Sequence, residues 1–180
     1  MGRMLSTEQV DAYARQGYVS PVEAFSPRQA RVYRDLLESA EQAGGGLSAD
    51  RRRKMHLYLK WADEIVRHPR VLDAVQDLIG PDILVFHLHH THLFHNSMPN
   101  RSADRRIGLG ISYIPTHCRC DSRQRLSASL VRGVDRHGNF DLDPAPVADF
   151  DPQGLRCHEA AMRRWHAARA ELIPKANAAA

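Results

Sequence analysis

Long apolar runs are absent from the sequence. No stretch approaches the roughly 18 consecutive apolar residues that span a bilayer, and the N-terminal MGRMLSTEQ has no apolar signal core. We therefore expect no membrane partner and a cytoplasmic location. Cysteine is scarce as well, with only Cys118, Cys120 and Cys157. An odd number without a secretory signal predicts reduced thiols rather than a disulfide framework.

A strong charge of one sign is also missing, because the formal net charge is only +4. The single dense basic run, Arg51 to Lys54, has no interleaved aromatic residues, which favours a solvated face over a nucleic-acid contact. The chain of 180 residues, 43% apolar and 26% charged, matches one ordinary folded domain covering 1–180.

The N-terminal part, residues 1–81, is predicted to be helical. Ser6 with Gln9 forms a capping-box pattern, and Ser26 before Pro27 repeats the start signal. The third segment is less regular than the others, and its interior is open to a break. Four helical segments are expected: Ser6 to Gly17, Ser26 to Gly44, Ala49 to Arg67 and Pro69 to Gly80.

After Pro81 the pattern changes to short runs of β-forming residues. Strands are expected at 83–86 and from 107 to 115, and residues 130–131 with 140–142 form either a weak hairpin or loops. The segment 152–172 is predicted to be helical again. Because helices come first and strands later, without regular βαβ alternation, we expect an α+β fold with a small antiparallel sheet.

Histidine is unusually frequent, with eleven in the chain and five within nine positions. In an extended chain His87, His89 and His95 share one face, while His90 and His92 point the other way. Imidazoles two positions apart can share zinc, iron, copper or nickel. The alternative is a polar strand face whose histidines are exposed or hydrogen-bonded.

The residues after this tract carry a family resemblance. HNSMPNRS from His95, the arginine eleven positions later and the YIPT that begins at Tyr113 resemble the second half of the metal site in the phytanoyl-CoA dioxygenase family of iron(II)/2-oxoglutarate oxygenases. The stretch WADEIVRHPRVLDAVQDLIGPDILVF is similar to the helical half that leads into the family's first barrel strand. LVRGVDRHGNFDLDP is similar to its C-terminal region.

This resemblance implies roles for two residues. His95 would be the distal histidine ligand of Fe(II), and Arg106 would pair with the far carboxylate of 2-oxoglutarate, a task that suits the planar guanidinium. Arg105 is the weaker candidate, because strand alternation turns it to the opposite face. Without the motif, Arg106 would be interpreted as a surface ion pair. The implied activity is hydroxylation of a small organic or acyl substrate.

The first half of the family's iron site is missing. Its H-x-D pair occurs nowhere in the chain, and only eight residues separate Phe86 from His95, too few for the intervening barrel strands. We therefore expect N-terminal helices packed on a truncated jelly-roll remnant at 82–145, a C-terminal helix at 152–172, and an inactive site. His89 is an auxiliary ligand only if the chain bends, because about 20 Å of extended strand separates it from His95 at about 3.3 Å per residue.

Two other functions stay open. One is a noncatalytic metal-binding module that uses the histidine tract or a second set of donors, although C-x-C spacing is unusual for structural zinc. The other is a scaffold that self-associates through exposed strand edges. The second donor set consists of His117, Cys118, Cys120, Cys157 and His158.

Overall fold

The computed structural model describes residues 3–43, 45–86, 101–105 and 107–178. Helices and a small sheet follow one another along the chain much as the sequence predicts. The elements are α1 (Thr7–Gln16), α2 (Pro27–Ala43), the 3-10 helix η1 (Met55–Leu57), α3 (Lys60–Val66), α4 (Pro69–Ile79), β1 (Ile83–Val85), β2 (Tyr113–Pro115), β3 (Ser127–Arg132), β4 (Asp141–Leu142) and α5 (Pro152–Ala178).

The first helix begins and ends at the predicted residues. The Ser6 hydroxyl accepts from the Gln9 amide at 3.3 Å, and the Gln9 side chain accepts from the Ser6 amide at 2.9 Å. Gly17 ends α1 with a φ of 80°, a left-handed conformation that suits glycine. The reciprocal capping pattern predicted at the start of α1 is confirmed.

The less regular third segment is broken in the structure. The chain turns at Lys54, whose φ is 47°, forms η1, and becomes extended at Leu59 before α3 begins. His56 to Leu59 are all buried. A continuous surface helix would have to expose one face of this run, so the break lets four consecutive side chains enter the interior.

The sheet has the strand order β2-β1-β3-β4, with β1 antiparallel to both of its neighbours. The predicted strand from 107 to 115 is wrong in its first six residues, because 107–112 lie outside any strand and β2 starts at Tyr113. Within the described residues its ladder partner is β1, which is three residues long. Neither alternative for 130–131 and 140–142, a hairpin or loops, describes the structure, since these residues fall in β3 and β4, which pair in parallel.

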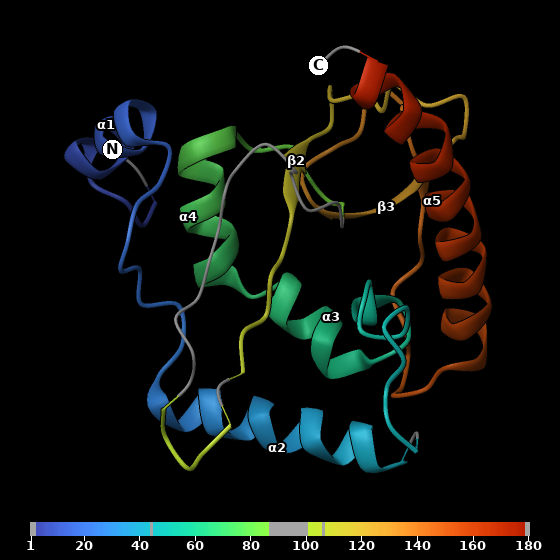
Figure 1. Cartoon of the computed structure of the whole chain (residues 1–180). Coiled ribbons are helices and arrows are strands. Elements are labelled where there is room, and N and C mark those ends of the chain that lie inside the picture. Colours follow the sequence, from blue (N-terminus) through green and yellow to red (C-terminus); the bar gives the residue numbers. More distant parts are fainter. Residues whose placement is uncertain (1–2, 44, 87–100, 106, 179–180) are drawn as a thin grey trace.

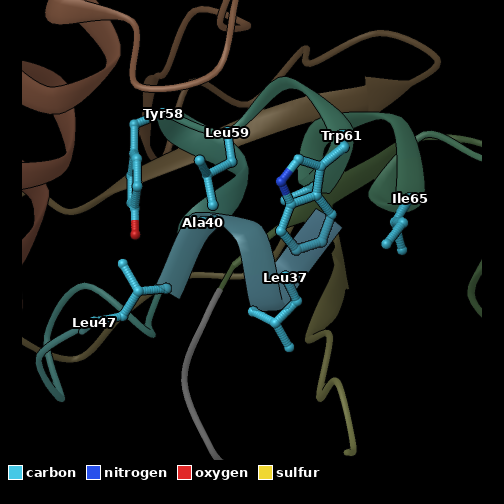
Figure 2. Close-up of a cluster of buried hydrophobic side chains, with 8 residues drawn as sticks. Leu37, Ala40, Leu47, Tyr58, Leu59, Trp61 and Ile65 are labelled. Atoms are coloured by element: carbon cyan, nitrogen blue, oxygen red, sulfur yellow. The ribbon is translucent and has the colours of Figure 1, made fainter. Parts of the chain in front are cut away.

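Helices cover the sheet from two sides, with α4 on one side and α5 on the other, while α2 lies below α3 (Figure 1). One buried cluster lies where α2, η1 and α3 meet, around Leu37, Tyr58 and Trp61 (Figure 2). A second joins the sheet to α5 through Leu84 and Ala168. The predicted α+β arrangement is confirmed at this level. No helix in the described part of the chain has the length and apolar character needed to cross a membrane.

Candidate functional site

Two adjoining hollows lie between the η1–α3 region and the extended segment that precedes β2, and together they are called the cleft below. They share the lining residues Arg52, Met55, Leu109 and Gly110. The inner hollow is further lined by Lys54, His56, Trp61, Ala62, Ile65, Val66, Val85, Ile111 and Ser112. The outer hollow continues along Leu37, Glu41, Ala49, Arg53, Arg105, Ile107 and Gly108.

Described residues on both sides of the histidine tract lie at this cleft. Val85, at the end of β1, lines the inner hollow, and Arg105 lines the outer one. The amide of Phe86 donates to the Ser112 carbonyl at 2.8 Å, so the last described residue before the tract is tied to the cleft wall. The proposed ligands His95 and His89 and the oxoglutarate contact Arg106 lie outside the described residues, and their roles stay predictions.

The buried, charged side chain of Lys54 lines the inner hollow. Its Nζ donates to the Ser127 carbonyl at 2.6 Å and lies 3.6 Å from Asp143 Oδ2, with side-chain exposures of 4% and 8% for the pair. Burial lowers the pKa of Lys54, and the Asp143 carboxylate opposes that change. Burial likewise raises the pKa of Asp143 against the effect of Lys54.

His56 is the imidazole that η1 contributes to the described part of the cleft, with 5% of its surface exposed. Neither His56 nor Lys54 was identified as a site residue from the sequence. His56 stands apart from the histidine tract, and Lys54 belongs to the basic run predicted to be solvated. That prediction is wrong for Lys54, because its countercharge comes from a residue far along the chain.

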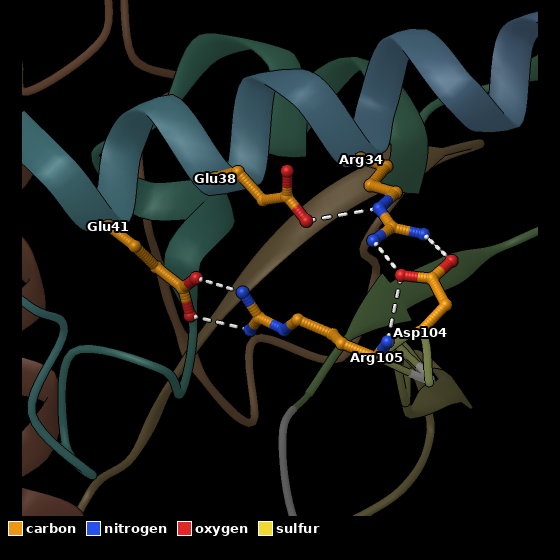
Figure 3. Close-up of polar contacts among 5 residues, drawn as sticks. All are labelled: Arg34, Glu38, Glu41, Asp104 and Arg105. Atoms are coloured by element: carbon orange, nitrogen blue, oxygen red, sulfur yellow. Dashed lines mark hydrogen bonds and ion pairs between the residues drawn. The ribbon is translucent and has the colours of Figure 1, made fainter. Parts of the chain in front are cut away.

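Ion pairs join the segment 101–105 to α2 (Figure 3). They are formed by five side chains that we call the clasp: Arg34, Glu38, Glu41, Asp104 and Arg105. Arg105 places both terminal nitrogens on Glu41 at 2.6 and 3.0 Å. Arg34 makes a two-pronged contact with Asp104 at 2.6 and 2.7 Å and donates through Nε to Glu38 at 3.0 Å. The hydrogen bonds from Arg34 lower the pKa of Asp104 to about 2. Arg105, the weaker oxoglutarate candidate, is therefore engaged by α2.

The alternative donor set of cysteines and histidines does not form a metal site here. His158 Nε2 lies 3.2 and 3.0 Å from the Asp50 and Arg53 carbonyls, so this nitrogen is used to cap a turn. Burial lowers the pKa of His158. All three cysteines are free thiols. Across the described ranges, no three His, Cys, Asp or Glu side chains are grouped closely enough to hold a metal ion.

Neither a family model nor a curated protein matches the sequence. Two solved structures match the fold. One is described as a non-heme monooxygenase, ThoJ-Ni complex, with a TM-score of 0.69 and 23% identity over 91% of this chain and 99% of that chain. The other is described as the non-heme monooxygenase ThoJ, apo, with a TM-score of 0.68 and 21% identity over 93% and 99%. The chain thus shares the fold of a non-heme monooxygenase.

Proposed function

We propose that this chain is a metal-dependent non-heme oxygenase that acts on a small organic substrate, and that the cleft is its substrate site. The observation that carries the proposal is that the described chain borders the cleft both before and after the histidine-rich tract. Val85 lies two residues before His87 and Arg105 lies ten residues after His95, and both residues line the cleft. The fold shared with a non-heme monooxygenase supports the same conclusion.

The ligand chemistry of the tract suits such a metal. Neutral imidazole binds iron and nickel, and His89 and His95 are the candidate ligands from the sequence. His56 adds a buried imidazole in the described wall of the cleft. Since the sequence has no H-x-D pair, we propose a site made of histidines rather than the usual two histidines and a carboxylate. The metal, when bound, would supply the activation of oxygen.

Other residues of the cleft would handle the substrate. Trp61, Ile65 and Val66 form an apolar wall that keeps water away from a bound molecule. The clasp holds Arg105 on Glu41, which leaves the neighbouring Arg106 as the proposed partner for the far carboxylate of 2-oxoglutarate. The expectation of an inactive site was based on the missing H-x-D pair, and the proposed histidine ligands would take the place of that pair.

Succinate formation tests this proposal directly. We expect purified chain without a histidine tag, supplied with Fe(II), oxygen and 2-oxoglutarate, to form succinate above the level of the His95→Ala variant. Arg106→Gln should raise the 2-oxoglutarate concentration needed for half-maximal turnover. His137→Ala, in an exposed loop, is the matched control and should leave turnover unchanged. Succinate formation equal in the native chain and the His95→Ala variant would contradict the metal site at His95, and no succinate above background from the native chain would contradict the proposed co-substrate.

A further inference from the structure

We infer that the cleft takes an organic anion with an apolar body, and that Arg52 binds its charged head. This inference rests on the proposed function only in treating the cleft as a substrate site. Two observations support the inference: the charges at the mouth of the cleft, and the apolar side chains that line the inner hollow.

At the mouth of the cleft, two guanidinium groups share one carboxylate. Arg105 occupies both oxygens of Glu41 at 2.6 and 3.0 Å, so Arg52 reaches the same group only at 3.5 Å. The Arg52 Nε donates to the Leu47 carbonyl at 3.0 Å, which fixes the side chain at the rim. Its side chain is nevertheless 60% exposed. A terminal nitrogen of Arg52 is therefore available to an anion in the outer hollow.

The other charges of the cleft are matched locally. Arg53 lies 3.0 Å from Asp50, and Lys54 is paired with the buried Asp143. The remaining carboxylates of the clasp, Glu38 and Asp104, are bound by Arg34 and line neither hollow. Counted together with these partners, the lining residues carry a surplus of about one positive charge, that of Arg52, which attracts an anionic group and repels a cationic one.

Beyond the mouth the lining becomes mostly apolar, although Lys54, His56 and Ser112 also line the inner hollow. Met55 and Leu109 belong to both hollows, and Trp61, Ile65 and Ile111 follow in the inner one. Trp61 and Ile65 are almost fully buried. A ligand that fits this gradient carries its charge at one end and a hydrocarbon or aromatic body at the other, because the body gains by leaving water.

A charge series with one aromatic body tests the inference. The metal-free full chain is titrated with 1-naphthoate, 1-naphthylmethanol and 1-naphthylmethylammonium, and binding is followed by fluorescence. We expect naphthoate to bind at least about tenfold more tightly than the alcohol, a difference of about 1.4 kcal/mol, and the ammonium compound to bind most weakly. Arg52→Gln should remove the preference for naphthoate. Arg31→Gln, an exposed change on α2 outside the cleft, is the matched control.

A gain of affinity provides the second arm. Glu41→Gln removes the carboxylate that competes for Arg52, so we expect naphthoate to bind severalfold more tightly, an outcome that misfolding cannot produce. Equal binding of acid and alcohol, no binding of either, or weaker binding to Glu41→Gln would overturn the inference. The titration is done without metal and is therefore independent of the succinate assay. If naphthoate binds as expected but no succinate forms, the proposed function is rejected and the inference stands.

Discussion

Lys54 and Asp143 are the pair of residues whose charges lie deepest beside the cleft. The lysine also donates to a β3 carbonyl and lies 5.8 Å from the centre of the Phe86 ring. Taking either charge out of water is costly, and each partner offsets the cost for the other. The pair therefore connects the turn before η1 to the chain that follows β4.

Removing both charges of the Lys54–Asp143 pair should destabilise the fold by less than the sum of the two single removals. We expect Lys54→Met and Asp143→Asn each to lower the free energy of unfolding by about 3 to 5 kcal/mol, because each leaves an uncompensated buried charge. The double variant Lys54→Met/Asp143→Asn should lose clearly less than the sum of the two single changes. Urea unfolding of the four proteins measures this coupling. Strictly additive losses would show that the two charges do not depend on one another.

At the residue scale the sequence reveals the histidine tract but misses the cleft residues. Five histidines in nine positions stand out in any reading of the chain. Lys54 does not, because the turn that buries it and the aspartate that neutralises it are far apart in sequence. A basic run beside a predicted helix start has the same appearance whether its last member is solvated or buried.

The clasp joins one element, α2, to the segment that follows the histidine tract. Arg34, Glu38 and Glu41 lie at helical spacing on one side of α2 and meet the adjacent Asp104 and Arg105 (Figure 3). Two two-pronged contacts on consecutive residues set the position of this segment with more geometric precision than single-point ion pairs would.

The clasp should weaken in acid. Arg34 holds the pKa of Asp104 at about 2, below the ordinary aspartate value of about 3.9. A lowered pKa means that the contact stabilises the fold above the ordinary value and is lost as the pH falls through about 2. We expect amide hydrogen exchange to show protection of 101–105 at pH 5 that disappears near pH 2.

A charge-neutral variant separates this effect from general acid unfolding. Asp104→Asn should reduce the protection of 101–105 severalfold at neutral pH, because the asparagine cannot make the charged contact with Arg34. Asp35→Asn, an exposed change on α2, should leave the protection of 101–105 unchanged. Unchanged protection in the Asp104 variant would rule out the clasp as the fastening of this segment.

Helix α5 packs closely against η1 at Gly154. A Cβ placed there would lie 2.1 Å from the Leu57 carbonyl oxygen, a contact with rigid backbone. We expect Gly154→Ala to lower the free energy of unfolding by about 1 to 3 kcal/mol, although alanine favours a helix over glycine by about 1 kcal/mol. Gly108→Ala is the control, since its Cβ meets open space. A Gly154→Ala protein as stable as the control in thermal unfolding would contradict the close packing.

Elements with local start and stop signals were predicted best. The capping residues and Gly17 defined α1, and Pro69 with Gly80 defined α4. The errors concern pairing between distant segments. Whether 107–112 joins a sheet depends on which strand lies beside it, and the parallel contact of β3 with β4 is likewise set by tertiary packing.

For the whole molecule, the sequence predicted helices on a small sheet with a further helix at the C-terminus, and the fold has this form. The resemblance to phytanoyl-CoA dioxygenases pointed to non-heme oxygenases, and the fold is shared with a non-heme monooxygenase. The co-substrate belongs to the proposed function, and the narrower family and a jelly-roll ancestry stay predictions. Self-association through the sheet edges stays a prediction. It would require β2 or β4, the two edge strands, to pair with a strand of a second chain.

Metal binding tests the central claim most directly. Chain prepared without a histidine tag is titrated with Ni(II) by calorimetry, with His95→Ala as the test variant and His137→Ala as the matched control. We expect about one ion per native chain and per control chain, and at least about tenfold weaker binding by His95→Ala, the scale of loss that metal-site changes typically cause. No binding by the native chain, or equal binding by the His95→Ala variant, would contradict the account.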